Sequence, residues 1–365
     1  MPYAERFARL RDLMRETDTD LVALGPSSHM VYMTGLSPHG DERPVMLLVG
    51  RDSACFLMPA LNADSSRAKT DLPFFPWADA EGPGGALARA LDATLGGKRS
   101  PSVALDETMR ADFALLLLDA LPGARRRFTD DTVGRLRARK DAAEFAVLKA
   151  NALLNDRAMQ AAYAALRPGV TEIEIARLVE AFYEANGAGT QFRSVCFGEN
   201  GAFPHHHSGS RTLKPGEPVL IDIGGRMDGY PSDMTRVAHL GEPSRRFAEV
   251  AAVVEAAVMA GIAAAKPGVL ASTVDRAARS VIEAAGYGPQ FVHRTGHGLG
   301  IDIHEPPYIT ATSDTVLEEG HVFSIEPGIY LPGEFGVRLE EIVILRADGA
   351  EVLSELPRAT HIVGA

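Results

Sequence analysis

Acidic residues inside apolar strands constrain this chain more than any other feature of its sequence. Residues 219–223 read Val-Leu-Ile-Asp-Ile, so Asp222 interrupts an apolar run that is typical of a buried strand. A tight hairpin is predicted to turn between Met227 and Asp228. Such a hairpin places Asp222 directly opposite Asp233, on one face of the ladder. Two carboxylates in that position repel each other and lose hydration, so we expect a cation between them.

A second pair of acids repeats this arrangement nearer the C-terminus. Glu326 lies on one predicted strand and Glu340 on the next, and their midpoint is Gly333, within a turn-rich loop. The two-residue alternation of a strand puts Arg338 on the same face as Glu340. Glu341 then points the other way, and we interpret it as an ordinary charge.

The segment between the two hairpins contributes His297 and His304. Together the two Asp, the two Glu and one of the histidines offer oxygen and nitrogen ligands suited to a pair of divalent ions such as Mn, Co or Zn. Any single pair of these residues could arise by chance. The complete set predicts a metal site.

Helices in the second half of the chain follow one pattern twice. A capping box that begins at Asp141 predicts a helix to residue 166, a Pro-Gly pair ends it, and a second helix covers residues 171–185. The same order recurs with helices at residues 244–265 and 272–285 around another Pro-Gly pair. The recurrence suggests a domain built from two similar halves.

The first half of the chain alternates predicted strands with predicted helices, which indicates an α/β layer. It contains no clear catalytic cluster, and its polar loop at residues 36–44 is expected to be a solvated turn. We therefore predict two domains, at residues 1–134 and 135–365.

Composition excludes several partners and locations. Lys and Arg number 37 against 48 Asp and Glu, and a net charge of −11 argues against nucleic acid or an anionic membrane as a partner. Cys55 and Cys196 are too few for a disulfide framework, which favours the reducing cytoplasm. The charged N-terminal residues do not predict a signal peptide, and the apolar residues 250–265 are expected to fall short of a membrane span.

The second half resembles the M24B metallopeptidase family, whose catalytic domain has the "pita-bread" fold. The first half resembles the creatinase-type N-terminal domain of the Xaa-Pro peptidases, prolidase and aminopeptidase P. The resemblance implies an α/β chain with that N-terminal domain before a pita-bread domain, assembled as a homodimer. The motifs that carry it are the pair Asp222 and Asp233, His297 in Gly-His-Gly, His304 in Ile-His-Glu-Pro-Pro, Glu326 in Ile-Glu-Pro-Gly and Glu340 in Val-Arg-Leu-Glu-Glu.

The resemblance also implies a role for each matching residue. Two divalent ions would be held by Asp222, Asp233, His297, Glu326 and Glu340, with Asp233 and Glu340 bridging. Glu326 would act as general base and then acid, while His205 and His304 would contact the substrate. His293 would line the proline pocket, and Phe192 and Ile303 would form its apolar wall. Arg338, the arginine of the family's Val-Arg motif, would take part in catalysis and bind the substrate.

The resulting hypothesis is a peptidase that hydrolyses the bond before a proline at position two of a small peptide. Prolidase, which acts on dipeptides, is favoured, and Arg43 in the polar loop is a candidate to bind the dipeptide carboxylate. The alternatives are an aminopeptidase P acting on longer peptides, another metal-dependent hydrolase or lyase of the fold, and a non-catalytic peptide-binding protein. Methionine aminopeptidase typically lacks the N-terminal domain, and creatinase does not keep this metal set.

Overall fold

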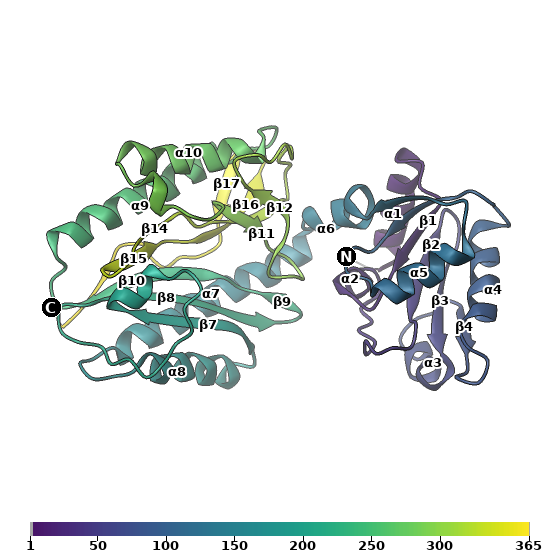
Figure 1. Cartoon of the computed structure of the whole chain (residues 1–365), viewed down its shortest axis with the longest axis horizontal. Helices are drawn as coiled ribbons and strands as arrows, with labels where there is room; N and C mark the ends of the chain where they lie inside the picture. Colours follow the sequence, from purple (N-terminus) through teal and green to yellow (C-terminus); the bar gives the residue numbers. More distant parts are fainter. Residues whose placement is uncertain (1–2, 365) are drawn as a thin grey trace. The chain divides into compact units, whose positions relative to one another are not determined.

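The computed structural model describes residues 3–364 of the chain. It divides into two compact units, Met1–Arg137 and Ala138–Ala365, whose elements are labelled in Figure 1. The boundary that we predicted after residue 134 lies three residues before this division.

The N-terminal unit contains a six-stranded sheet in the order β4-β3-β2-β1-β5-β6. β1 pairs with β2 in antiparallel fashion and with β5 in parallel, as an alternating α/β layer allows. The strands are β1 (Leu21–Leu24), β2 (Met46–Gly50), β3 (Ala54–Pro59), β4 (Phe74–Trp77), β5 (Ser102–Leu105) and β6 (Arg125–Phe128). The helices are α1 (Tyr3–Glu16), α2 (Ser28–Thr34), α3 (Ala60–Arg67), α4 (Gly84–Leu95) and α5 (Ala111–Ala120).

The two edge strands of this sheet are β4 and β6. β6 reads Arg-Arg-Arg-Phe, which has neither the apolar alternation nor the apolar run of a buried strand, and it pairs only with β5. Charged side chains at an edge also protect it from pairing with another chain. A short turn of π-helix at Asp130–Gly134 and helix α6 (Arg135–Ala138) follow.

The C-terminal unit contains two larger sheets and a two-stranded ribbon, β14-β15. One sheet has the order β18-β10-β8-β7 with β9 beside β8, and the other has the order β12-β11-β13-β16-β17. The helices are α7 (Ala142–Ala165), α8 (Glu172–Ala185), α9 (Arg245–Ala264) and α10 (Ala271–Ala284). The first sheet is formed by β7 (Gly189–Phe197), β8 (Pro218–Met227), β9 (Tyr230–Pro231), β10 (Met234–Leu240) and β18 (His361–Val363). The remaining strands are β11 (Gly296–Gly298), β12 (Glu305–Ile309), β13 (Val322–Ile325), β14 (Gly328–Leu331), β15 (Phe335–Arg338), β16 (Glu341–Arg346) and β17 (Gly349–Val352).

The two halves of this unit share one pattern of backbone hydrogen bonds, as the predicted duplication requires. In each half a Pro-Gly turn joins two helices, with φ of +83° at Gly169 and +88° at Gly268. The N–H of Gly169 donates to the carbonyl of Leu213, and that of Gly268 donates to the carbonyl of Leu317, both at 2.8 Å. Each leucine donates back to the residue after the glycine, also at 2.8 Å. Equivalent turns therefore tie each helix pair to the segment that leads into β8 in one half and into β13 in the other.

Helix α9 corrects one expectation. At 20 residues it is long and apolar enough, by length and composition, to cross a membrane, whereas we expected residues 250–265 to fall short. The apolar run begins earlier than we placed it, because Phe247 also belongs to the buried face. That face packs in the core of the C-terminal unit, where Val250 and Val254 are fully buried.

Candidate metal centre

The hairpin of β8 and β10 carries Asp222 and Asp233 in a register that differs from the predicted one. Asp228 and Gly229 form its turn, with φ of +52° and +82°, as a two-residue Asp-Gly turn of type I′ requires. The turn is centred one residue later than predicted, so Asp222 pairs with Thr235. Asp233 is the diagonal neighbour of Asp222 on the same face, not its direct partner. The Asp-Gly pair was the sequence signal for this register.

The second pair of acids faces each other as predicted. The ladders β13-β16 and β14-β15 keep one common register, and Glu326 and Glu340 occupy the gap between them, opposite each other. Pro327 follows Glu326 and has no N–H to donate, so the ladder is interrupted at this point. The backbone N–H groups of the two residues donate instead to other strands or strand ends, that of Glu326 to the carbonyl of Thr295 and that of Glu340 to the carbonyl of Thr235.

The structure brings the four acids and His297 together in one pocket of about 730 Å³. The Nε2 atom of His297 lies 3.2 Å from Glu326 Oε1 and 3.6 Å from Asp233 Oδ2. Single ligand atoms of Asp233, His297 and Glu340 lie within 4.8 Å of one another. Asp222 lines the same pocket, so residues from five strands or strand ends converge at one place.

Electrostatics show that this cluster is built for a cation. Burial, and after it the neighbouring carboxylates, hold the pKa of Asp233 and of Glu340 well above the ordinary value. Burial also raises the pKa of Asp222. One oxygen each of Asp222 and Glu340 is buried without a hydrogen-bond partner. Buried acids that repel one another and keep unpaired oxygens fit divalent ions with oxygen and nitrogen ligands.

Glu326 differs from the other acids. Burial by itself would raise the pKa of Glu326. The hydrogen bond and charge of His297, together with the charges of His293 and Arg338, outweigh that effect and lower the pKa to about 2. Ser324 Oγ also donates to Glu326 Oε1 at 2.9 Å. Glu326 is therefore held as a carboxylate that accepts hydrogen bonds.

Arg338 braces the acids from behind. Its Nη2 donates to Asp222 Oδ2 at 2.7 Å, and its Nε donates to Thr235 Oγ1 at 2.9 Å. The Thr235 hydroxyl in turn donates to Glu340 Oε2 at 2.9 Å. Arg338 Nη1 donates to the hydroxyl of Tyr330 at 2.9 Å. Tyr330 was missed in the sequence, although alternation from Glu326 along β14 would have put it on the same face.

His293 contributes its ring rather than a free nitrogen. Its Nε2 accepts from the Tyr330 hydroxyl at 2.7 Å, and its Nδ1 donates to the carbonyl of Arg294 at 2.7 Å. Burial lowers the pKa of His293, so the neutral ring assumed in this assignment is the favoured form. With both nitrogens engaged, the imidazole presents carbon surface to the pocket.

The other predicted substrate residues line the same pocket. The ring of His304 is partly exposed, with its centroid 4.0 Å from that of His297. Partial burial and the nearby charge of His297 lower the pKa of His304 to about 4. The complete lining is Gln191, Phe192, Phe203, Pro204, His205, Asp222, Asp233, Val292, His293, Arg294, His297, Ile303, His304, Glu326, Arg338 and Glu340.

Glu172 is a second residue that sequence reasoning missed. It is the first residue of α8 and is fully buried. Its carboxylate accepts hydrogen bonds from Phe197 N (2.8 Å), Asn200 Nδ2 (2.8 Å), His206 Nε2 (2.9 Å) and Gly209 N (3.0 Å). These bonds tie down the loop that carries His205, and they agree with a packing role for His206.

Glu341 is not the ordinary charge that we predicted. It is 2% exposed and forms ion pairs at 2.8 Å with Arg236 and at 2.9 Å with Arg358. Arg236 also donates to the carbonyl of Leu356, so the C-terminal segment covers this side of β16. The alternation of the strand was right, but its second face is also buried.

Arg43 lies in the N-terminal unit with its guanidinium fork engaged. Its Nε and Nη2 donate to the two carboxylate oxygens of Asp79 at 3.0 and 3.1 Å.

Another group of potential ligands in that unit consists of His29, Asp106 and Glu107. His29 Nε2 lies 2.9 Å from Glu107 Oε1, and Ser27 donates to Asp106.

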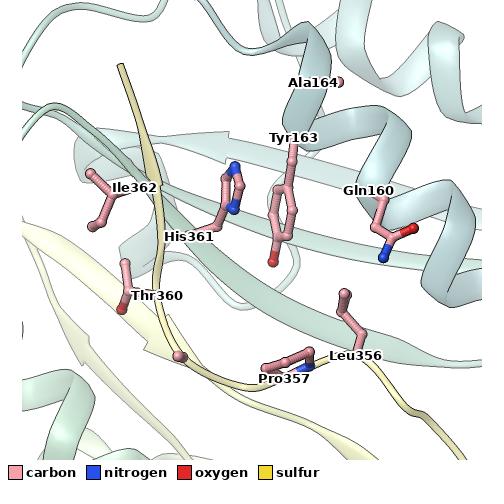
Figure 2. Close-up of a pocket in the computed structure, with 9 residues that line it drawn as sticks. Gln160, Tyr163, Ala164, Leu356, Pro357, Thr360, His361 and Ile362 are labelled. Carbon is pink, nitrogen blue, oxygen red and sulfur yellow. The ribbon is translucent and has the colours of Figure 1, made fainter. Parts of the chain in front are cut away.

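A second pocket of the C-terminal unit, of about 460 Å³, has a different character. Figure 2 shows Tyr163 of α7 and His361 of β18 side by side, with ring centroids 4.3 Å apart and planes within 2°. None of the residues that line it is Asp or Glu. The acid and histidine ligands described above therefore belong to the first pocket.

Comparison with known proteins agrees with this architecture. Residues 146–347 match metallopeptidase family M24, and residues 6–138 match the Creatinase/Prolidase N-terminal domain. The chain belongs to the M24 metallopeptidases. This membership confirms the predicted family and fold class.

Individual relatives of this M24 peptidase align over nearly the whole chain. An Xaa-Pro dipeptidase of Lactobacillus delbrueckii subsp. lactis is 34% identical over 93% of this chain and 94% of its own. The structure of dipeptidase PepE from Mycobacterium ulcerans superposes with a TM-score of 0.93 at 34% identity, covering 99% and 98% of the two chains. A recombinant prolidase from Thermococcus sibiricus superposes with a TM-score of 0.90 at 31% identity and full coverage of both chains.

Proposed function

We propose that this protein is an Xaa-Pro dipeptidase that uses two divalent metal ions. The observation that carries the proposal is the convergence of four carboxylates and His297 in a pocket whose remaining wall is rich in rings and aliphatic groups. Relatives of the same length that are named Xaa-Pro dipeptidase or prolidase support this choice of substrate. An aminopeptidase P that acts on longer peptides is the alternative that the experiment below distinguishes.

The residues present fit the metals that the family requires. Asp222, Asp233, His297, Glu326 and Glu340 would hold the two ions. Mn, Co and Zn all suit this mixture of carboxylates and one imidazole. When bound, such ions lower the pKa of a water molecule and polarise the scissile carbonyl.

Glu326 is the proposed proton carrier. Ser324 donates to its Oε1, which orients the carboxylate and leaves Oε2 to take a proton from the attacking water. The same carboxyl then delivers the proton to the leaving nitrogen. His304 and His205, which line the pocket, would donate to the developing oxyanion and to the second substrate carbonyl.

Proline at position two suits the apolar side of the pocket. Its nitrogen has no N–H to satisfy in the peptide bond, so a wall of rings and aliphatic groups costs no hydrogen bond. Phe192, Ile303 and the ring of His293 form that wall. The substrate's free amine would pair with an acid such as Asp222, which explains cleavage from the N-terminus.

We also propose a cytoplasmic homodimer. The homodimer rests on the resemblance to the family. The location is supported by Cys55 and Cys196, which are both buried and unpaired, as a reducing compartment favours.

The experiment measures bound metal and hydrolysis of Ala-Pro, Ala-Pro-Ala and Ala-Ala. We expect two ions per chain, preference for Ala-Pro, and loss of both metal and activity in Asp233→Asn. The matched control is Glu249→Gln, an exposed acid on α9 that pairs with Arg245, and it should keep both. Full activity after complete metal removal would contradict the proposal, and better cleavage of Ala-Pro-Ala would assign an aminopeptidase P.

A further inference from the structure

We infer that Arg294 binds a carboxylate group of the substrate, an inference that rests on the proposed dipeptidase function. A dipeptide ending in proline brings a free carboxylate into a pocket already lined by four acids. Desolvating that carboxylate without a cationic partner is unfavourable. A guanidinium group is the side chain best shaped to bind it, because its fork matches both oxygens.

Two guanidinium groups line the pocket among the residues that the structure describes, those of Arg294 and Arg338. Arg338 is 4% exposed, and each of its three nitrogens already donates to a protein oxygen, on Asp222, Thr235 and Tyr330. Its charge is committed to the ligand Asp222 at 2.7 Å. Arg338 therefore serves to brace the centre and not to receive a carboxylate.

Arg294 is in the opposite situation. It is partly exposed at the pocket, and within residues 3–364 no salt bridge engages it. Its positive charge acts on His304, whose pKa it helps to lower, so its guanidinium lies within electrostatic range of a proposed substrate contact. The Arg43 fork, which we first considered for this role, is occupied by Asp79.

The surroundings of Arg294 hold it in place while leaving its fork unpaired. Its guanidinium carbon lies 4.7 Å from the ring centroid of Tyr308, a cation–π contact that orients a side chain without consuming its N–H donors. Helix α10 fixes the backbone on both sides. Asp275 accepts from the N–H and hydroxyl of Thr295, and Arg279 donates to the carbonyl of His293.

The carboxylate has two sources in a small peptide. One is the terminal carboxylate that follows the proline, and the other is an acidic side chain at position one. The chemistry of binding is the same for both sources, and three substrates separate them. Ala-Pro has only the terminal carboxylate, Asp-Pro-amide has only the side-chain carboxylate, and Ala-Pro-amide has neither.

The test compares kcat and KM of the native metal-loaded enzyme and of Arg294→Ala on these three substrates. Loss of a hydrogen-bonded charge pair should raise KM about 10- to 100-fold for the substrate whose carboxylate Arg294 binds. We expect kcat to change less than about threefold, because the contact is made equally in the ground state and in the transition state. Where the native enzyme does not turn over an amide, the inhibition constant of that amide replaces KM.

Two further variants sharpen the test. Arg276→Ala removes an equal charge from an exposed position on α10 that does not line the pocket, and it should leave all three KM values unchanged. Tyr308→Leu removes the aromatic platform while keeping the Arg294 charge, and it should give a smaller rise in KM for the same substrate.

The outcomes separate failure of this inference from failure of the proposed function. A selective rise for Ala-Pro assigns Arg294 to the terminal carboxylate, and a selective rise for Asp-Pro-amide assigns it to the side chain. An equal loss on all three substrates, or no change on any, overturns the inference. A native enzyme with two bound metals that hydrolyses no Xaa-Pro substrate overturns the proposed function instead.

Discussion

The buried carboxylate of Glu172 offers a sharp test of how the active-site loop is held. Its Oε1 accepts from Phe197 N and Asn200, and its Oε2 accepts from His206 and Gly209 N. Glu172→Gln keeps the shape of the side chain but turns one oxygen into an NH₂ group. The new NH₂ group then faces two of the four donors and cannot accept a hydrogen bond from either.

The expected loss of stability follows from those contacts. If the amide oxygen takes the place of Oε1, His206 can change its tautomer and accept from the new NH₂, but the backbone N–H of Gly209 cannot. One buried donor without an acceptor costs about 1–3 kcal/mol, and the remaining bonds lose the contribution of a charged acceptor. We therefore expect the free energy of unfolding to fall by about 2–4 kcal/mol. In a domain of roughly 230 residues this lowers Tm by roughly 5–15 °C.

The assay combines thermal unfolding with amide hydrogen exchange, and Glu174→Gln is the matched control. Glu174 lies on the same helix, is exposed, and bonds Thr171 in the capping box, so its amide variant should cost less than about 1 kcal/mol. Exchange should accelerate within residues 197–209 in Glu172→Gln only, and the KM for Xaa-Pro substrates should rise because His205 lies in that loop. Equal destabilisation by both variants, or unchanged exchange in the loop, would refute the reasoning.

Two further predictions concern buried ionisable groups. Glu341→Gln should destabilise the protein by about 3–5 kcal/mol, because it leaves the fully buried Arg236 without its charged partner. The control Glu249→Gln, at an exposed pair, should cost less than about 0.5 kcal/mol. Similar losses of unfolding free energy for the two variants in urea would contradict the first prediction. Burial, with the charges of Lys140 and Arg139, lowers the pKa of His321 to about 3, so the unfolded state binds the extra proton below its own pKa of about 6.5 and stability falls as pH drops through that value. His321→Gln should remove a slope of about 1.4 kcal/mol per pH unit between pH 6.5 and 4, and a variant whose unfolding free energy keeps the native pH dependence would show that His321 does not titrate in this way.

Local signals in the sequence predicted much of this protein. The capping box at Asp141 does begin helix α7, because both of its hydrogen bonds join residues three positions apart. The four acidic candidate ligands were recognised because carboxylates inside apolar strands need a compensating charge wherever those strands pack. The register of the first hairpin was also within reach, since the Asp228-Gly229 pair defines its turn through positive φ angles. For the capping box and for the hairpin turn, the deciding interactions lie within a few residues of one another.

Only the tertiary structure decided which charges are free and which are committed. Glu172 looked like an ordinary acid at a helix start until the loop after β7 folded back onto it. Glu341 became a buried ion pair because the C-terminal segment covers a face that strand alternation had assigned to solvent. Arg294, in contrast, lines the same pocket as the acids, and its guanidinium packs on the ring of Tyr308 without an ion pair to any residue that the structure describes. The energy of a charge depends on how much water surrounds it and on which groups, often a hundred residues away, share its cavity.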